Sequence, residues 1–197
     1  VLSDTSKFNI NENKKSYKKE SNLKSKKNLI DKTVKLILSS KKTVIVAGGG
    51  IKYNSKYKSV TKLAEFLNIP IVTAAGHGDA IPFSHKLNAG QMGPRGNIVA
   101  SRLVKEAELI IAIGTRLGFN STFYSYDNIN KNAKIVQIEL EKTMIGRYFP
   151  INVGIHGDAA LVTDQILAEL RKQKKIFNYK EWTNSFLLER SKFLKDR

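Results

Sequence analysis

The chain has 197 residues, of which 41% are hydrophobic, and it carries a formal net charge of +17. This length and apolar content suffice for one buried core in a domain of about 150 residues with extensions. The absence of cysteine excludes disulfides, a thiolate nucleophile and a cysteine-based zinc site. No apolar run approaches the ~20 residues that cross a bilayer, and the first residues lack the apolar core of a signal peptide. We therefore expect a soluble, cytoplasmic protein with no membrane partner.

The positive charge is concentrated at the two ends of the chain. Residues 1–43 have 12 lysines against four acidic residues, and residues 171–197 have nine Lys or Arg against three, which leaves +3 for residues 44–170. A groove that follows a phosphate backbone needs clustered cations on a folded face, with aromatic residues between them for stacking. The middle of the chain has neither, so we expect no nucleic-acid partner and interpret the ends as solvated, lysine-rich extensions.

Residues 1–27 are dominated by Lys, Asn and Ser, have no sustained apolar period and are typical of a linker from a preceding domain. We place the boundary of the globular domain at Asn28 and its end at residue 172. The first expected element is a helix through Leu29 to Leu38, because apolar residues recur there at helical spacing.

Three short apolar runs, rich in β-branched residues, each end on glycine or on an acidic residue. They are Thr43–Ala47 before Gly48, Gly49 and Gly50; Leu109–Ile113 before Gly114, Thr115 and Arg116; and Lys134–Ile138 before Glu139. Such runs are typical of strands buried on both faces of a parallel sheet, so each following loop lies at a carboxyl end. Loops at that edge form nucleotide sites in doubly wound folds.

The remaining elements alternate in the same way. We expect an amphipathic helix from Tyr57 to Leu67, a strand over Ile69–Thr73 opened by Pro70, and a long glycine-rich loop over residues 75–97. A helix over Ile98–Ala107 follows, with Ile98, Leu103 and Val104 inward. The later elements are a helical turn over Lys142–Ile145, a strand over Val153–His156 and a helix from Asp158 to Arg171.

Strands separated by helices of this length predict βαβ units, so the fold class is α/β, with a parallel sheet covered by helices on both faces. The last stretch, Phe177–Leu194, predicts an amphipathic helix. We interpret residues 173–197 as a connection to a following domain, with that helix packed on another part of a larger protein.

The glycines after the first strand allow a backbone to approach a ligand closely, and a following helix start would direct N–H groups at a phosphate. Gly48 and Gly50 match the first two glycines of G-x-G-x-x-G, but Tyr53 occupies the third place, so this is not the dinucleotide fingerprint. A tight strand-to-helix turn without a ligand explains the three glycines equally well.

Polar residues at the other strand ends suit the same kind of ligand. Arg116 is placed to bind a phosphate beside the hydroxyl of Thr115, and Glu139 stands where a carboxylate accepts bonds from ribose hydroxyls. For Arg116 the alternative is a surface ion pair. Asp158 is better explained as a helix N-cap.

The histidines suggest no chemistry of their own. His77, His85 and His156 have neither metal-ligand spacing nor a motif such as H-E-x-x-H. His77 and Asp79 could form an acid/base pair in the long loop, but an ordinary loop turn with satisfied polar groups explains them better. No serine lies in G-x-S-x-G, so the sequence predicts no catalytic residue and no metal site in this chain.

Five sequence blocks occur in an order that resembles a known family. They are VIVAGGGI (44–51), LAEFLNIPIVTAAGHGDAIPFSHKLNAGQMGPRG (63–96), LIIAIGTRLG (109–118), IVQIEL (135–140) and GIHGDA (154–159). The chain resembles the central domain of thiamine diphosphate-dependent enzymes of the acetolactate synthase and pyruvate oxidase group. Within that group, residues 76–90, 114–126 and 153–159 look most like sulfoacetaldehyde acetyltransferases, which convert sulfoacetaldehyde and phosphate into acetyl phosphate and sulfite.

The resemblance implies a six-stranded, Rossmann-like sheet of the DHS type and a three-domain enzyme that forms homodimers or homotetramers. In that group the first domain supplies the glutamate that activates thiamine diphosphate, and the last binds its diphosphate through Mg²⁺ with a G-D-G…N motif. Here Gly78-Asp79 and Gly157-Asp158 are not followed by a third glycine. The resemblance therefore implies that the other domains bind thiamine diphosphate and Mg²⁺, and that this chain alone is inactive.

The central domain of the group binds FAD in acetolactate synthase, ADP in oxalyl-CoA decarboxylase and no nucleotide in others. Carried over by motif, the contacts fall on Gly48, Gly49, Gly50, Met92, Gly93, Gly114, Thr115, Arg116, Glu139 and Asp158. The synthases continue G-A-R-F-D-D-R, whereas this chain has GTRLGFN, so Gly118 and Asn120 replace an Asp and an Arg. This loss disfavours FAD and leaves FAD, ADP or an empty pocket open.

Two other classes of protein are alternatives. A sirtuin-like deacylase shares the sheet type, but it requires a cysteine-bound zinc module and this chain has no cysteine. A purely structural or interaction domain is the stronger alternative, because the sequence has no catalytic group.

Overall fold

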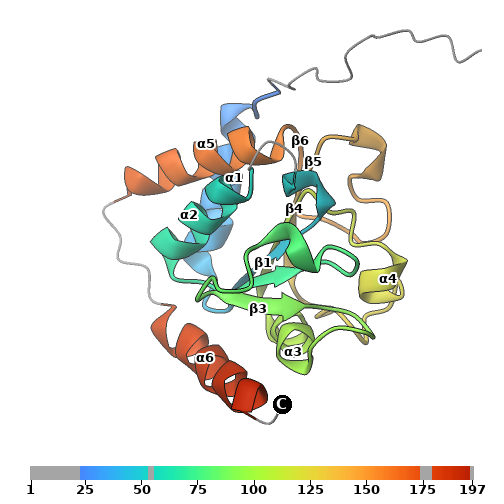
Figure 1. The fold of residues 1–197 in the computed structure, drawn as a ribbon. Helices are drawn as coiled ribbons and strands as arrows, with labels where there is room; N and C mark the ends of the chain where they lie inside the picture. The colour runs from blue at the N-terminus through green and yellow to red at the C-terminus, as the bar shows by residue number, and fades with distance from the viewer. Residues whose placement is uncertain (1–22, 53–55, 174–178, 196–197) are drawn as a thin grey trace, which may run out of the picture.

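The computed structural model describes residues 23–52, 56–173 and 179–195. Six strands form one parallel sheet (Figure 1): β1 (Thr43–Ala47), β2 (Ile71–Thr73), β3 (Asn88–Gln91), β4 (Leu109–Ile113), β5 (Lys134–Glu139) and β6 (Val153–His156). Their order is β3-β2-β1-β4-β5-β6. The predicted six-stranded, Rossmann-like α/β fold is thus confirmed. Residues 1–22 of the linker that was predicted over residues 1–27 lie outside the described residues, as does the helix start predicted at Phe177.

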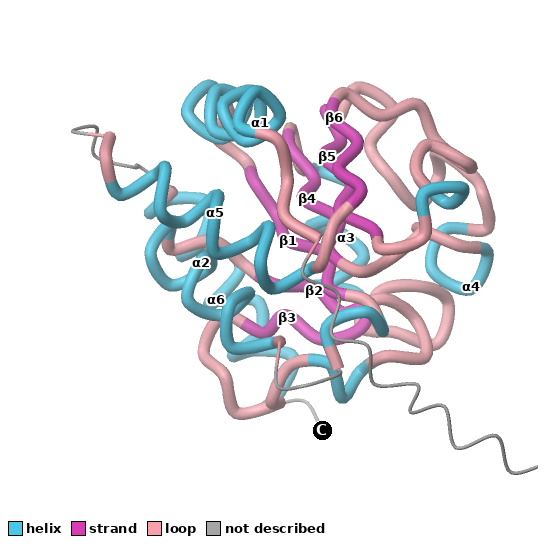
Figure 2. The backbone as a smooth tube through the Cα atoms, turned by 90° about the horizontal axis from the view of Figure 1, so that it is seen from above, coloured by secondary structure: helices cyan, strands magenta, loops and turns pink. Residues whose placement is uncertain are grey.

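Helices cover both faces of the sheet, as predicted (Figure 2). Helices α1 (Lys27–Ser39), α2 (Tyr57–Leu67) and α5 (Ala159–Arg171) lie on one face, and α3 (Ile98–Glu106) and α6 (Lys180–Lys195) lie on the other. Short elements complete the fold: α4 (Phe119–Thr122) and the 3₁₀ turns η1 (Gly49–Ile51), η3 (Gly78–Ala80) and η4 (Lys142–Met144).

Strand β1 shows why apolar runs without alternation form this sheet. Ile45 and Ala47 pack into the core under α1, α2 and α5, whereas Val44 and Val46 pack into the core under α3 and α6. All five residues of β1 and of its neighbour β4 are buried. A strand in this position must be apolar on both faces, which is the pattern found in the sequence.

Side-chain caps fix the starts of two helices. Asn97 accepts hydrogen bonds from the N–H groups of Val99 and Ala100, and Asp158 caps α5 in the same way. The prediction that Ile98 points inward is wrong, because Ile98 is 73% exposed. It is the first residue after the cap, and the buried stripe of α3 begins one residue later, at Val99.

Two boundaries at the β2 edge differ from the prediction. Residues 75–97 are not one loop, because they contain η3 and the edge strand β3. Strand β3 pairs only with β2, with a register shift, and its sequence NAGQ lacks β-branched residues, so it gave no strand signal. Pro70 does not open β2, which begins at Ile71. Instead its carbonyl accepts a hydrogen bond from Ile45 N at 3.1 Å.

Helix α6 packs on this domain, so the expectation that its apolar side lies on another part of the protein is wrong for its buried residues. Trp182 and Phe186 belong to the core under α3, and Trp182 Nε1 donates to the carbonyl of Thr43 at 3.0 Å. Just before α6, the hydroxyl of buried Tyr179 donates to the carbonyl of Ile37 at 2.6 Å.

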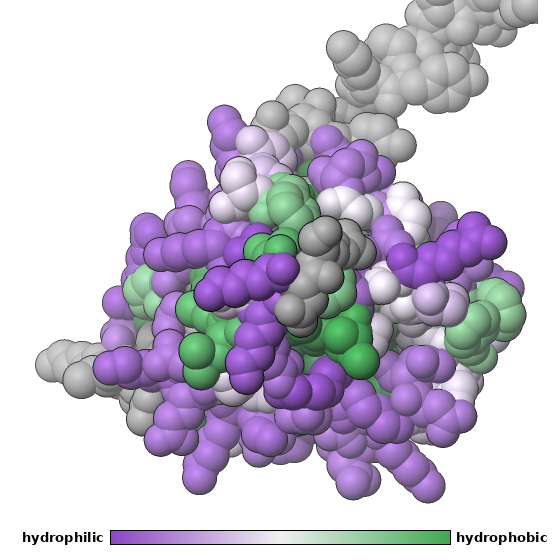
Figure 3. Space-filling model, turned by 60° about the horizontal axis from the view of Figure 1, so that its bottom comes forward, coloured by the Kyte–Doolittle hydropathy of each residue, from purple (hydrophilic) through white to green (hydrophobic). Residues whose placement is uncertain are grey.

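The outward side of α6 remains partly apolar, with Leu187, Leu188 and Leu194 exposed. Figure 3, turned so that the bottom of the Figure 1 view comes forward, shows small groups of apolar residues among hydrophilic ones. No helix in the described ranges is long and apolar enough to span a membrane.

We predict that Phe186→Ala lowers the free energy of unfolding by about 3–5 kcal/mol, because it empties a site in the core under α3. Leu188→Ala, on the same helix but 66% exposed, changes it by less than about 0.5 kcal/mol. Urea denaturation of the two variants measures both values. Equal, small effects would contradict the packing of α6 on this domain.

Candidate functional site

A cavity of about 570 Å³ lies at the carboxyl edge of the sheet. It opens beside the ends of β1 and β4, the two central strands from which the strand order runs outward in opposite directions. In open α/β sheets this switch point is where ligands bind. The predicted site residues that line it are Gly49, Gly50, Gly114, Thr115, Arg116 and Glu139.

Backbone-to-backbone contact between two glycine loops forms the floor of the cavity. Gly48 N donates to Ile113 O and Gly50 N donates to Gly114 O, both at 3.0 Å. A Cβ on Gly48 would lie 2.3 Å from the Gly114 oxygen, and one on Gly50 would lie 2.8 Å from the Gly114 Cα. Gly114 also has φ +61°. Glycine is therefore required on both sides of the contact.

The predicted helix start directly after these glycines is absent. The chain makes the 3₁₀ turn η1, and α2 begins at Tyr57; Tyr53, which breaks the dinucleotide fingerprint, lies outside the described residues. Within the described ranges, Gly49 N has no hydrogen-bond acceptor. A turn N–H, rather than the N-terminus of a helix, is thus the backbone donor at this point.

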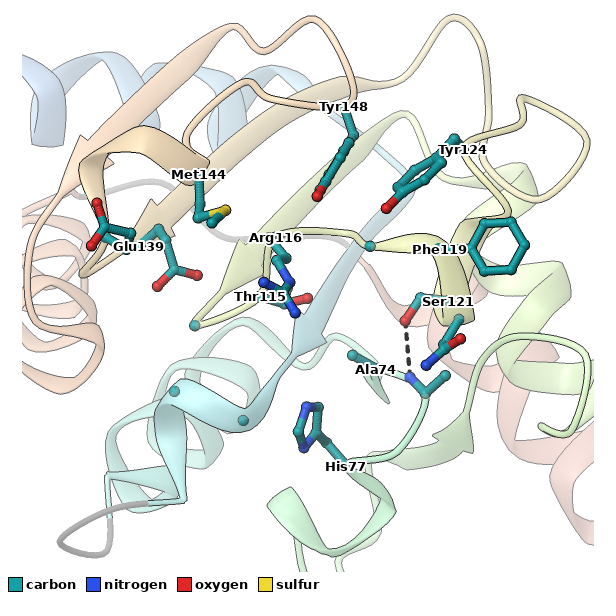
Figure 4. Close-up of a pocket in the computed structure, with 17 residues that line it drawn as sticks. Ala74, His77, Thr115, Arg116, Phe119, Ser121, Tyr124, Glu139, Met144 and Tyr148 are labelled. Atoms are coloured by element: carbon teal, nitrogen blue, oxygen red, sulfur yellow. Dashed lines mark hydrogen bonds between the residues drawn. The ribbon is translucent and has the colours of Figure 1, made fainter.

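Arg116 is the cation beside this contact (Figure 4). Its side chain is exposed, and no described carboxylate lies within ion-pair distance. The alternative of a surface ion pair is therefore not found within the described ranges. Thr115 is buried, and its hydroxyl accepts a hydrogen bond from Leu117 N at 3.2 Å, so it shapes the loop that carries Arg116.

Carboxylates line one end of the cavity, as Figure 4 shows for Glu139. Glu139 ends β5 and accepts a hydrogen bond from Leu140 N at 2.9 Å. Glu141 also lines the cavity, and hydrogen bonds from the hydroxyl and N–H of Thr143 hold its pKa below the usual range. At neutral pH this end attracts hydroxyl donors or cations.

Sequence reasoning missed the buried amide that fixes this end. Gln137, only 2% exposed, donates to the carbonyls of Thr115 and Met144 and accepts from Gly146 N at 2.8 Å. It joins the Arg116 loop to the segment around η4. A polar residue inside an otherwise apolar strand, KIVQIE, was the available signal, because a buried amide needs specific partners.

Aromatic rings form the opposite end, around α4. Tyr124 and Tyr148 stack with ring centroids 4.3 Å apart, and Phe119 lies 5.6 Å from Tyr124. The hydrogen bond with Tyr148 raises the pKa of the Tyr124 hydroxyl. Sequence reasoning named none of these rings as site residues, because aromatic residues between strands give no local signal of a cavity.

His77, interpreted from sequence as part of a loop turn, lines the cavity below Arg116 in the view of Figure 4. Its ring lies against Gly49, where an added Cβ would come within 2.7 Å of the imidazole Cε1. The buried Nδ1 has no hydrogen-bond partner among the described residues. Burial first, then Lys52 and Arg116, lower the pKa of His77, while Asp79 opposes them.

Four candidate residues do not line the cavity. Gly48 lies in the floor beneath it, and Met92 is 1% exposed within the core under α3. Gly93 packs on α4, because an added Cβ would lie 2.6 Å from the Asn120 oxygen. Asp158 forms an ion pair with Lys56 and caps α5, which confirms the capping interpretation.

The other two histidines have ordinary partners. His85 Nε2 lies 3.0 Å from a Glu65 carboxylate oxygen, and His156 Nε2 lies 3.0 Å from the Leu140 carbonyl. The described residues contain no group of three or more His, Asp or Glu that could hold a metal ion.

Comparison with known proteins identifies the family of this chain. The family described as "Thiamine pyrophosphate enzyme, central domain" matches residues 30–166. A sulfoacetaldehyde acetyltransferase of Roseovarius nubinhibens is 38% identical over 143 residues, 72% of this chain and 24% of that protein. A probable acetolactate synthase large subunit of Methanococcus aeolicus is 33% identical over 156 residues, 77% of this chain and 26% of that protein.

The chain therefore belongs to the central-domain family of thiamine pyrophosphate enzymes, which confirms the resemblance found in the sequence. It spans about a quarter of the length of these relatives. An acetolactate synthase large subunit of Buchnera aphidicola is 30% identical over 159 residues, which are 79% of this chain and 27% of that protein.

We predict that Gly114→Ala is much more destabilising than Gly76→Ala. Both glycines have positive φ, +61° and +81°, so each substitution costs about 1–2 kcal/mol of backbone strain. Nothing lies within 4 Å of an added Cβ at Gly76, whereas at Gly114 it would meet the Gly50 backbone at 2.9 Å. That clash adds about 1–3 kcal/mol. Equal losses in urea denaturation would contradict the close contact of the two loops.

Proposed function

We propose that this chain is the nucleotide-binding central domain of a thiamine diphosphate-dependent enzyme, and that its cavity binds a nucleoside diphosphate. The observation that carries the proposal is the glycine contact at the switch point, with Arg116 beside it and no ion-pair partner for Arg116 among the described residues. A floor without side chains lets a diphosphate approach the backbone, and a guanidinium is the side chain best suited to bind it.

The residues present fit such a ligand in three parts. Arg116 and the N–H of Gly49 would hold phosphate oxygens, because both donors lack protein acceptors in the described ranges. Glu139, at the end of β5, would accept hydrogen bonds from ribose hydroxyls. The dinucleotide resemblance of the glycine turn is weak, so the proposal depends on the geometry rather than on the motif.

The lining favours ADP over FAD. Gly118 and Asn120 line the cavity at the places where the sequence resemblance puts an aspartate and an arginine in FAD-containing synthases. With these charges absent, Arg116 is the arginine left to bind the ligand. A single arginine is enough for the compact diphosphate of ADP. An extended flavin dinucleotide benefits from several charge-assisted contacts, so one arginine suits it less well.

For the whole enzyme we propose a sulfoacetaldehyde acetyltransferase type, with acetyl phosphate as product. The support is that relatives carrying this name are 35–38% identical, against 30–33% for relatives named acetolactate synthase. Thiamine diphosphate would supply the carbanion chemistry, held with Mg²⁺ by other domains of the same polypeptide. The alternatives are an acetolactate synthase with FAD and a non-catalytic interaction domain.

The nucleotide proposal predicts that Arg116→Ala weakens ADP binding by about tenfold to a hundredfold, since a lost charged contact costs about 1.5–3 kcal/mol. The melting temperature of the ligand-free domain stays nearly unchanged, because the side chain is exposed. Isothermal titration at pH 7.5 measures the affinity, with Arg95→Ala, an exposed arginine outside the cavity lining, as control. Unchanged affinity in the Arg116 variant would remove this residue from the site.

The enzyme proposal predicts that the 197-residue chain and the full-length enzyme differ in cofactor binding and in activity. The 197-residue chain shows no calorimetric signal with thiamine diphosphate and Mg²⁺ and no turnover. The full-length enzyme forms acetyl phosphate from sulfoacetaldehyde and phosphate. Formation of acetolactate from pyruvate, without acetyl phosphate, would instead establish the acetolactate synthase alternative.

A further inference from the structure

The nucleotide proposal leaves His77 without a role, although its imidazole stands in the cavity with the proposed phosphate donors. It comes from the loop after β2, whereas Gly49 follows β1 and Arg116 follows β4. Three adjacent strands thus each bring one potential anion donor to the same place. Figure 4 shows His77 below Arg116, with a gap between the two side chains.

The position of the ring is fixed by packing. The imidazole lies on the face of Gly49, which can have no Cβ for this reason. Lys52, directly after η1, forms a 2.5 Å ion pair with Asp79 in η3, which joins the turn that carries Gly49 to the turn that follows His77. Asp79 is 73% exposed, and this ion pair therefore orients the loops more than it stabilises the fold.

A buried ring nitrogen without a partner is unusual in a folded protein, because desolvation of a polar atom is costly. The Nδ1 of His77 is such an atom among the described residues. In contrast, both nitrogens of His85 have partners, Glu65 and the N–H of Leu87. The unsatisfied imidazole is thus confined to the histidine in the cavity.

We propose that His77 is a proton-linked phosphate ligand: the cavity takes up its nucleoside diphosphate together with a proton on His77. This inference rests on the proposed nucleotide-binding function and adds a regulatory property, an affinity that rises as the pH falls. A protonated imidazole near Gly49 and Arg116 would add a second cation to a cavity whose lining, among the described residues, includes Arg116 and no lysine.

The charges around His77 set the sign of the effect. Lys52 and Arg116 are the cations that face it, Asp79 is the nearest carboxylate, and Glu139 and Glu141 line the far end of the same cavity. Without ligand, burial and the two cations lower the pKa of His77 from its ordinary 6.5, so the ring is neutral at pH 7–8. A bound anion reverses the local charge and raises that pKa. Proton uptake therefore accompanies binding, and affinity increases from pH 8 downward until the ligand-free ring is itself protonated.

The most direct test follows the imidazole protons of the 197-residue chain by NMR during pH titration, with and without saturating ADP. The chain has only three histidines, so each is assigned by a single substitution. We expect ADP to raise the pKa of His77 by about one unit or more, whereas that of His85, paired outside the cavity, stays unchanged and serves as the internal control.

Affinities give the matching thermodynamic readout. For each of three proteins, the unmodified chain, His77→Asn and His85→Asn, the ADP affinity is measured at pH 6.0 and at pH 8.0 and the ratio is taken. Because the ionisation of ADP changes all three ratios equally, it cancels when the ratios are compared. A rise of one pKa unit makes this ratio larger in the unmodified chain than in His77→Asn by a factor of up to about ten, and the ratio in His85→Asn resembles that in the unmodified chain. His77→Lys, which keeps a cation at every pH, loses the extra pH dependence.

The outcomes separate this inference from the function on which it rests. If ADP binds but leaves the pKa of His77 unchanged, and His77→Asn keeps the same affinity ratio, the proton-linked role is wrong and the nucleotide site stands. If ADP binds at neither pH, both proposals fail. The pKa values are read from the unmodified chain, and variants of His85 and His156 leave the remaining signal to His77, so the result does not depend on the folding of a His77 variant.

Discussion

The contact between the glycine turns after β1 and β4 is the constraint on which the rest of the structure depends. Gly48 and Gly50 pack directly on Gly114, and two 3.0 Å backbone hydrogen bonds, to the carbonyls of Ile113 and Gly114, hold the loops together. Any larger residue at these positions would push the two strand ends apart. Two buried parallel strands therefore end in loops that turn outward without filling the space between them. The cavity is the consequence of this packing, and its position at the switch point follows from the strand order.

Different elements line different parts of the cavity, so its charge and polarity change from one end to the other. Carboxylates from β5 and η4 line one end, the cation of Arg116 lies in the middle, and the rings around α4 form the other end. Gln137 and the hydrogen bond from Ala75 N to Ser121 Oγ, 2.9 Å long, tie these loops to one another. A pre-formed, graded cavity suits a ligand with an anionic centre and polar and aromatic ends, which is the description of a nucleotide. In our proposal, His77, which lines the same cavity, links binding of the nucleotide to uptake of a proton.

Much of the fold could be predicted from the sequence, because local signals and tertiary requirements coincide there. The apolar runs of β1, β4 and β5, the Asp158 cap of α5 and the glycines at the strand ends each need a particular kind of residue for a local physical reason. Prediction failed where tertiary context decides. Strand β3 exists because β2 offers it a free edge, α6 packs on this domain because Trp182 and Phe186 fill its core, and His77 enters the site because a loop folds over Gly49. No local pattern contains that information.

The central claim is that the carboxyl edge of this sheet binds a nucleotide at the glycine contact. Amide chemical-shift mapping of the isotope-labelled chain during titration with ADP tests it most directly, since the signals report position as well as affinity. The account predicts saturable shifts of Gly49, Gly50 and Arg116, with no change at the opposite, amino edge around Lys42. Saturable shifts confined to another surface, or no shifts at millimolar ADP, would contradict it.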